Sequence, residues 1–394
     1  MAYTLRLSIL LFAIALLLSA CRPVTAPAPP APVLDDATAA AIDAIVQTYM
    51  TDFPIPGFQV CVVKDGQVAY SKGFGLADVD TARPMTPQSI VIQASITKAF
   101  VAMAVMRLAE QGLIDLDAQV TDYLPYFTMA DERYQAITVR MLLSHRGGLP
   151  DSPVYWPEPL DPALNPLEQA VRDLGEMELL FAPDDGWRYS GYGYSTLGAI
   201  IAAVTGQPFE EYMAAEWLTP LGMVNSTFVT DAVDPEMRVT LYTGYKLSRL
   251  RTQAPPTDAR DASAGNLWSS CADMALWGQF IQNGGERNGV RLLQPESFEA
   301  MWAPRSESGW LLGPTYGPLV ERYGLGWFLG AVDGRRLVGH MGDGDGINTQ
   351  MLVAPDDGLA VFTMANWMDA GTAQGSFPAS FAAMDVMKTL LGGE

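Results

Sequence analysis

Ser95 and Lys98 could perform nucleophilic chemistry, because they lie three positions apart within the apolar run 90–109. On a helix, side chains at this spacing share a face and can touch. Where apolar neighbours exclude water, the pKa of a lysine falls, and its free amine can accept the serine proton near neutral pH. A helix N-terminus would also stabilise an oxyanion. The simpler alternative is an N-cap serine followed by a surface lysine, because S-x-x-K is a common pattern.

Two further segments carry residues that would complete such a site. Tyr189 lies in RYSGYGYSTLG, before a turn that opens a helix, and a tyrosine can shuttle a proton when a nearby cation stabilises its phenolate. His340 lies in the strand-like run LVGHMG, where Gly342 would let a substrate approach the strand backbone. Taken singly, these residues are a packed aromatic and an ordinary strand histidine. Together with Ser95 and Lys98 they indicate a catalytic set.

The apolar pattern predicts the elements that position these groups. Two β-rich runs flank Asp65–Gly66, a strong hairpin signal, and three more follow near the C-terminus at 335–342, 348–358 and 359–366. Helices are predicted at 95–111, 167–180, 193–205, 209–217, 270–282 and 377–391. The expected fold class is α/β (α+β), with an antiparallel sheet built from both chain ends, flanked by helices, and a largely helical insert. The sheet part covers about 38–94 and 265–394, and the helical part about 95–264.

The order of these motifs resembles that of the serine β-lactamase and penicillin-binding-protein superfamily, in its class C-related branch of esterases and D-peptidases. The likeness extends beyond the three motifs, because four longer segments also resemble family elements. They are TPQSIVIQASITKAFVAMAVMRLAEQGLIDLDAQVTDYLP, ITVRMLLSHRGGLP, TPLGMVNSTF and SAGNLWSSCADMALWGQFIQNGG. The similarity spans about residues 42–366, so it covers nearly the whole chain after the N-terminal region.

The resemblance implies a role for each residue of the set. Ser95 would be the acylated nucleophile, Lys98 its base partner, and Tyr189 the relay that carries a proton to the leaving group and back from water. His340 stands where many relatives place a lysine, on what is expected to be an edge strand beside Tyr189. The oxyanion hole would consist of the backbone N–H groups of Ser95 and Asp343. No cofactor is expected.

Two departures from the family pattern bear on the substrate. Gly191 stands where many relatives have an asparagine whose amide contacts the acyl side chain of the substrate. His340 has an ordinary pKa of about 6.5 and would be mostly neutral where a lysine stays charged. Both changes weaken recognition of a β-lactam. An asparagine at position 191 is therefore expected to raise β-lactam turnover, and affinity for anionic substrates to grow below about pH 6.5. The other histidine, His145, is expected to be structural.

Three functions compete on this evidence. The first is a serine hydrolase acting on ester or amide substrates, D-amino-acid peptides among them. The second is a β-lactamase or D,D-carboxypeptidase acting on β-lactams or peptidoglycan peptides. The third is a non-catalytic binding protein of the cell envelope. The joint presence of Ser95, Lys98 and Tyr189 argues against the third, since a binding module has no need of them.

The first residues predict export and a lipid anchor. Arg6 precedes the uncharged run LSILLFAIALLLSA, which suits a signal peptide and is too short for a permanent membrane span. Leu18–Cys21 resembles the bacterial lipobox, so Cys21 would be lipidated. The proline-rich stretch 22–33 reads as an extended spacer. We therefore expect a signal peptide at 1–20, a lipidated tether at 21–37 and a hydrolase domain at 38–394, held at a bacterial membrane outside the cytoplasm.

Composition limits the partners. The formal net charge of −20 argues against a nucleic-acid partner, and two histidines are too few for a histidine-rich metal site. The partners expected are a small-molecule or peptide substrate and the membrane, and the protein is expected to be a monomer. After Cys21 only Cys61 and Cys271 remain, too few for a disulfide framework, and each reads as a buried small residue. Whether these two pair is left open.

Overall fold

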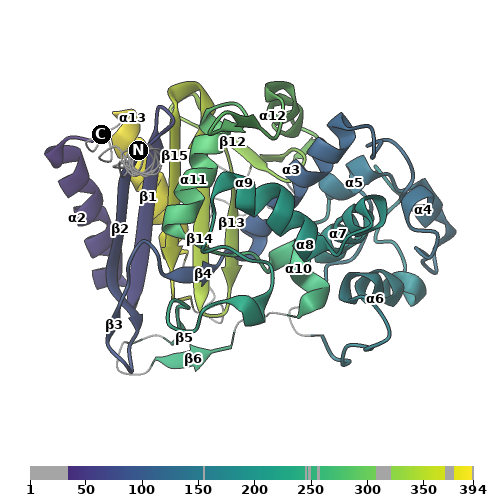
Figure 1. Ribbon diagram of the computed structural model, residues 1–394, viewed down its shortest axis with the longest axis horizontal. Helices are drawn as coiled ribbons and strands as arrows, with labels where there is room; N and C mark the ends of the chain where they lie inside the picture. The colour runs from purple at the N-terminus through teal and green to yellow at the C-terminus, as the bar shows by residue number, and fades with distance from the viewer. Residues whose placement is uncertain are drawn as a thin grey trace, which may run out of the picture. The chain divides into compact units, whose positions relative to one another are not determined.

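The computed structural model describes residues 34–392, except 154–155, 245, 247–249, 255–257, 308–320 and 369–376. Nine strands of the described chain form one antiparallel sheet (Figure 1) in the order β10-β11-β12-β13-β14-β15-β1-β2-β3. Their bounds are β1 (Gly57–Lys64), β2 (Gln67–Asp78), β3 (Arg83–Pro84), β10 (Ser306–Glu307), β11 (Arg322–Tyr323), β12 (Phe328–Val332), β13 (Arg335–Gly344), β14 (Ile347–Ala354) and β15 (Leu359–Ala365). Because β1 pairs with β15, the two ends of the chain build one sheet, and the predicted fold class is confirmed.

The hairpin between β1 and β2 forms where the sequence predicts it. Asp65 and Gly66 both have positive φ, 50° and 71°, as the tight hairpin turn requires. Along β1 the side chains alternate between two apolar clusters, with Val60 and Val62 in one and Cys61 and Val63 in the other. Both sheet faces are therefore covered, which explains why these strands read as continuous apolar runs.

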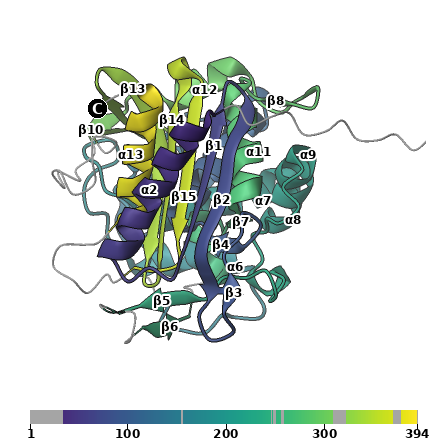
Figure 2. The same ribbon diagram turned by 90° about the vertical axis from the view of Figure 1, so that its left-hand side faces the viewer.

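Helices cover both faces of the sheet, and the two helices from opposite ends of the sequence lie side by side on one face (Figure 2). On one face lie α2 (Asp36–Asp52), which the sequence analysis did not predict, and α13 (Pro378–Leu391), which it did. On the other face α11 (Cys271–Gln282) packs against β1 and β15. A disulfide joins Cys61 of β1 to Cys271 of α11, so these residues are a bonded pair rather than two separate buried thiols.

The helical part adjoins β13 and holds most of the remaining helices. They are α3 (Thr97–Glu110), α4 (Val120–Tyr123), α5 (Val139–Leu143), α6 (Pro166–Arg172), α7 (Gly191–Thr205), α8 (Phe209–Met213), α9 (Thr219–Leu221) and α10 (Ala262–Gly265), with α12 (Pro295–Met301) nearer the sheet. Three small sheets also form: β4 (Ile90–Ile92) with β7 (Trp268–Ser270), β5 (Leu241–Thr243) with β6 (Arg251–Gln253), and β8 (Glu286–Arg287) with β9 (Val290–Arg291).

Two predicted helices are shorter than expected. The helix predicted at 167–180 ends at Arg172, where a 3₁₀ turn containing Gly175 follows. The helix predicted at 209–217 is α-helical only to Met213 and continues as a π turn over Ala214–Leu218. The run 90–109 also divides: its β-branched start, Ile90–Ile92, pairs with β7, and the helix begins at Thr97.

The N-terminal expectations lie outside the described residues. The signal peptide, Cys21 and the proline-rich spacer all precede Leu34, while α2 begins at Asp36, inside the range expected as tether. Within the described ranges, no helix has both the length and the apolar character that a membrane span requires.

Candidate active site

The nucleophile turn, residues 93–96, connects β4 to α3 and presents Ser95. Ser95 lies in a single 3₁₀ turn, directly after Ala94, whose φ of +47° is unusual for a residue with a side chain. Strained backbone of this kind persists only where the surroundings hold it. Strand β13 packs against the turn, and a Cβ placed on Gly342 would lie 2.1 Å from the carbonyl oxygen of Gln93. The space beside Gly342 is therefore filled by the protein's own backbone and is not open to a substrate.

Lys98 lies next to Ser95 within a helix that is buried almost all round. Only Arg107, Ala109 and Glu110 of α3 are not buried, and Lys98 itself is 3% exposed. Its Nζ lies 3.2 Å from Ser95 Oγ and donates a hydrogen bond of 2.7 Å to the carbonyl oxygen of Ala264. Burial lowers the pKa of Lys98 to about 8, although nearby aspartates oppose the shift. This is the lowered pKa that the sequence analysis predicted.

Tyr189 completes the contacts around Ser95. It directly precedes Ser190, the N-cap of α7, whose Oγ accepts a hydrogen bond from Gly193 N–H at 3.1 Å. Lys98 Nζ lies 4.7 Å from the centre of the Tyr189 ring. Burial raises the pKa of Tyr189 well above 10, and a side-chain hydrogen bond with Ser95 acts in the opposite direction. The phenol is therefore neutral before the reaction begins. Lys98 loses its proton at a lower pH than Tyr189 does.

His340 is fully buried and cannot supply the charge that a lysine would supply. Its Nδ1 lies 2.6 Å from Met341 O and its Nε2 3.2 Å from the hydroxyl of Tyr323. Burial and the nearby Lys98 lower the pKa of His340 to about 3, so the ring is neutral. In that form Nδ1–H donates to the carbonyl and Nε2 accepts from Tyr323 O–H. The expectation that this imidazole gains charge near pH 6.5 is wrong, because burial and the nearby Lys98 hold its pKa well below that value.

The position of β13 in the sheet also differs from the expectation. It is not an edge strand, because β12 pairs with it from Arg335 to Gly339. The pairing between β12 and β13 stops at Gly339, and His340 to Asp343 continue beside the nucleophile turn. The ring of His340 lies 6.2 Å from that of Tyr189, and both residues line the pocket described below.

His145 packs against Tyr189 and is not among the residues that line the pocket. Its ring centre is 4.3 Å from that of Tyr189, and its Nδ1 accepts the backbone N–H of Ser190 at 3.2 Å. Burial holds its pKa well below the usual value. His145 therefore supports the tyrosine through packing, as a structural residue would.

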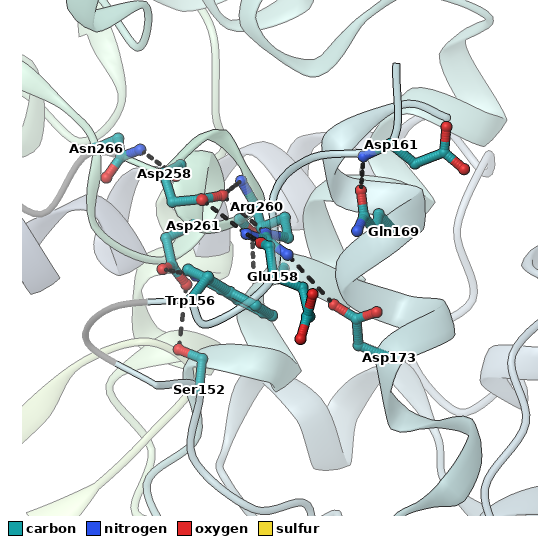
Figure 3. Close-up of polar contacts among 11 residues, drawn as sticks. Ser152, Trp156, Glu158, Asp161, Gln169, Asp173, Asp258, Arg260, Asp261 and Asn266 are labelled. Atoms are coloured by element: carbon teal, nitrogen blue, oxygen red, sulfur yellow. Dashed lines mark hydrogen bonds and ion pairs between the residues drawn. The ribbon is translucent and has the colours of Figure 1, made fainter. Parts of the chain in front are cut away.

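The space at Gly191 is already occupied. Its N–H donates to Asp151 Oδ1 at 2.6 Å, and a Cβ placed on it would lie 2.0 Å from Ser152 Oγ. Ser152 Oγ in turn donates to Asp261 Oδ1 at 3.1 Å. An asparagine at position 191 must therefore displace Ser152 from Asp261. The predicted gain in β-lactam turnover from that substitution therefore depends on whether the Ser152 hydroxyl turns away from Asp261 (Figure 3).

These residues enclose a cavity of about 430 Å³ that opens to solvent. Four aspartates line it: Asp151, Asp261, Asp343 and Asp345. Among the described residues, Lys98 is the one lining side chain that carries positive charge, because His340 is neutral. We call Asp151 and Asp261, with Ser152 between them, the acidic wall. Within the part of the chain that the structure describes, no three metal-ligating side chains gather at one point.

The acidic wall was not predicted from the sequence. Asp151 directly follows the family-like segment 137–150, and Asp261 precedes the segment 263–285 by two residues. Their place next to recognised segments was the available signal, but nothing in the sequence joins one to the other. Asp343 was chosen for its backbone N–H, which together with that of Ser95 remains the predicted oxyanion hole.

Comparison with known proteins gives a consistent set of relatives. A family model described as Beta-lactamase matches residues 42–380. Protein flp of Staphylococcus aureus (strain MW2) is 28% identical over 329 residues, which cover 82% of this chain and 62% of that protein. Esterase EstB of Burkholderia gladioli is 34% identical over 220 residues, covering 52% of this chain and 54% of the esterase. The chain thus matches less than two thirds of the length of either relative.

Solved structures are similar over most of the chain. The octameric penicillin-binding protein homologue from Pyrococcus abyssi has a TM-score of 0.77 and 28% identity, covering 91% of this chain and 78% of that one. The D-amino acid amidase from Ochrobactrum anthropi SV3 has a TM-score of 0.74 and 22% identity, covering 91% and 98%. At that identity the second likeness shows the shared fold alone.

Proposed function

The chain belongs to the beta-lactamase family. From this premise we propose that it is a serine hydrolase that cleaves small ester or amide substrates through an acyl-enzyme on Ser95. One observation carries the proposal. The amine of Lys98, whose pKa is lowered to about 8, lies 3.2 Å from Ser95 Oγ at the wall of a cavity that opens to solvent. A buried amine at hydrogen-bond distance from a serine is the arrangement that activates a nucleophile.

The proposed reaction proceeds in two stages. Ser95 Oγ attacks the substrate carbonyl as its proton passes to the free amine of Lys98, and the backbone N–H groups of Ser95 and Asp343 stabilise the oxyanion. Tyr189 passes a proton to the leaving group, which departs with the bonding electron pair. Water then attacks the acyl-enzyme and gives up a proton along the same route, and the acid product leaves with Ser95 restored.

The alternative activity is hydrolysis of β-lactams or peptidoglycan peptides. The pocket argues against it, because these substrates present a carboxylate and the described pocket offers no cation except Lys98. Esterase EstB among the relatives supports hydrolysis of small esters as the first activity to test.

The decisive experiment combines labelling with turnover. We expect a fluorophosphonate probe to add to Ser95, located by mass spectrometry, and p-nitrophenyl butyrate to be hydrolysed. Ser95→Ala should abolish the adduct and lower kcat/KM by about 10⁴-fold or more, because a covalent nucleophile is lost. An adduct on another residue would contradict the assignment. Efficient nitrocefin hydrolysis with poor esterase activity would establish the alternative, and no adduct with no turnover would favour a binding protein.

We further propose that Cys21 is lipidated and holds the protein at the outer face of a bacterial membrane. The lipobox-like tetrapeptide Leu18–Cys21 supports this, and so does the Cys61–Cys271 disulfide, since structural disulfides are typical of oxidising compartments. Metabolic labelling with an alkyne palmitate analogue should mark the wild-type protein and not Cys21→Ala. Label retained in that variant would contradict the anchor.

A further inference from the structure

A buried tyrosine outside the pocket is hydrogen-bonded to His340. The hydroxyl of Tyr323 lies 3.2 Å from His340 Nε2, and both side chains are fully buried. Tyr323 belongs to β11, which one strand separates from β13, so its side chain reaches across β12. Tyr323 is not among the residues that line the pocket. Burial of these two polar groups is tolerated because each satisfies the other.

The contacts of the His340 ring determine which nitrogen carries the proton. Nδ1 lies 2.6 Å from the carbonyl oxygen of Met341, which can only accept, so the proton is on Nδ1. Nε2 then holds a lone pair and requires a donor, and the hydroxyl of Tyr323 faces it. The neighbouring hydroxyl of Tyr194 donates to the carbonyl oxygen of Leu143 at 2.9 Å, so its proton points elsewhere. Tyr323 therefore stabilises the Nδ1–H tautomer of His340.

Side chains of β14 fix one edge of β13 beside the nucleophile turn. Gln350 Nε2 donates to the carbonyl oxygen of His340 at 3.2 Å. Thr349 Oγ1 lies 3.2 Å from the carbonyl oxygen of Gly342. Because the backbone groups of successive residues point to alternate edges of a strand, those of Met341 face the opposite edge, toward β12.

That opposite edge is where the substrate carbonyl would bind. The pairing of β13 with β12 ends at Gly339, so Met341 and Asp343 lie beyond the paired part. The His340 ring binds the carbonyl oxygen of Met341, and the N–H of Asp343, two residues on, points to the same edge. The Asp343 N–H is a predicted oxyanion donor, and such donors act only if they are held in place before the reaction. The His340 ring therefore holds the edge from which this donor projects.

We propose that Tyr323 is a positioning residue of the active site. Its hydroxyl holds His340 in the tautomer that binds the Met341 carbonyl. The strand edge fixed in this way directs the N–H of Asp343 at the oxyanion. The inference rests on the proposed function, since the oxyanion belongs to the proposed acyl transfer. His340 then supports the oxyanion hole and supplies no charge, in agreement with its neutral ring.

The first test is Tyr323→Phe, which removes the hydroxyl and keeps the ring. We expect kcat and kcat/KM for p-nitrophenyl butyrate both to fall by about tenfold or more, because an oxyanion donor acts in the transition state. In nitrogen NMR of the histidine rings, the wild-type His340 should show a protonated Nδ1 and an unprotonated Nε2, and the variant a mixture of tautomers. A folded variant that keeps the wild-type tautomer, or a kcat within about threefold of wild type, would overturn the proposal.

His340→Asn and His340→Leu test the contact with Met341. An asparagine can place an N–H near the position of Nδ1, whereas a leucine offers no donor to the Met341 carbonyl. We expect kcat of the asparagine variant to exceed that of the leucine variant by about tenfold or more. Equal kcat values would overturn a role through Met341. Should Tyr323→Phe unfold, as circular dichroism would reveal, these two variants and the wild-type NMR pattern test the proposal instead.

Tyr242→Phe is the matched control. The Tyr242 hydroxyl accepts the N–H of Val79 at 2.8 Å, and the residue is buried and does not line the pocket. We expect its kcat to stay within about threefold of wild type, with an unchanged tautomer of His340. A loss equal to that in Tyr323→Phe would overturn the specific role. The adduct on Ser95 and ester hydrolysis by the wild type report the proposed function separately. A wild type with neither would refute that function, and the inference with it.

Discussion

The two sides of the pocket are held in different ways. The nucleophile side is held by backbone packing: Ser95 lies in the 3₁₀ turn before α3, Lys98 lies in the first turn of α3, and Gly342 of β13 packs against the 3₁₀ turn. The acidic wall is held by hydrogen bonds of side chains, from Ser152 Oγ to Asp261 in the 3₁₀ turn at 259–261 and from Gly191 N–H of α7 to Asp151. In the proposed reaction, bonds form at the first side, whereas the second side borders the space beside Gly191.

The strongest test of the nucleophile side is Lys98→Arg. A guanidinium group keeps its charge at any accessible pH, so it cannot accept the proton of Ser95. We expect the rate of acylation by p-nitrophenyl butyrate to fall by about 10²- to 10⁴-fold, the usual contribution of a general base. Stopped-flow release of p-nitrophenol measures it, and circular dichroism checks the fold. Near wild-type acylation would show that Lys98 is structural.

Gly342→Ala tests the contact between β13 and the nucleophile turn. The new methyl group would lie 2.1 Å from Gln93 O and 2.5 Å from Thr349 Oγ1, so strand and turn must separate. We expect a loss of about 1–3 kcal/mol in the free energy of unfolding and about 10- to 100-fold in kcat/KM. Denaturant unfolding and ester hydrolysis measure the two effects.

Gly344→Ala is the matched control on the same strand. A Cβ there meets nothing closer than Ile347 Cγ2 at 3.7 Å, an ordinary contact. We expect its stability to stay within about 0.5 kcal/mol of wild type. If both alanine variants behave alike, the close approach at Gly342 is not what orders the turn.

The pH dependence of acylation gives a smaller effect with a definite sign. Loss of a proton from Lys98 creates the base, so the rate should rise with pH through its pKa of about 8. For a neutral ester, this predicts an increase of about tenfold in kcat/KM between pH 7 and pH 9. A rate that is flat or falls over this range would contradict Lys98 as the base.

An NMR titration can test whether the ring of His340 is neutral. The protein has two histidines, and burial lowers the pKa of both His145 and His340. The Cε1–H signals of both rings should therefore keep constant NMR shifts between pH 5 and pH 8. A ring that titrates near pH 6.5 would restore the cationic role that the sequence suggested.

The sequence revealed the nucleophile side because its signals are local. Ser95 and Lys98 are three residues apart, and the apolar run around them predicts the burial that lowers the pKa of the lysine. Asp65–Gly66 likewise marks the first hairpin within a few residues. Side-chain type, spacing and periodicity suffice for such features.

The acidic wall could not be predicted because its contacts join residues that are far apart in the sequence. Ser152 and Asp261 are 109 residues apart, and Gly191 and Asp151 are 40 apart. The disulfide joins cysteines separated by 210 residues. The charge of His340 failed as a prediction for a related reason: its pKa depends on burial among residues from several elements. Such properties exist only once the chain has folded.

The smallest expected effect is that of Gly191→Asn on nitrocefin hydrolysis. The asparagine would need the space that Ser152 Oγ fills, 2.0 Å from the position of its Cβ, and Ser152 is held there by Asp261. Even with Ser152 displaced, the amide would lie beside two carboxylates that repel the anionic β-lactam. We therefore expect a change of less than about threefold in kcat/KM for nitrocefin in the single variant.

Gly191→Asn combined with Ser152→Gly removes the obstruction and keeps the charge of the acidic wall. If the double variant gains about tenfold while the single one does not, space alone limited the activity. If neither gains, the carboxylates of the acidic wall are the barrier. A gain of about tenfold in the single variant would show that Ser152 yields freely, and that this side of the pocket is less fixed than its hydrogen bonds indicate.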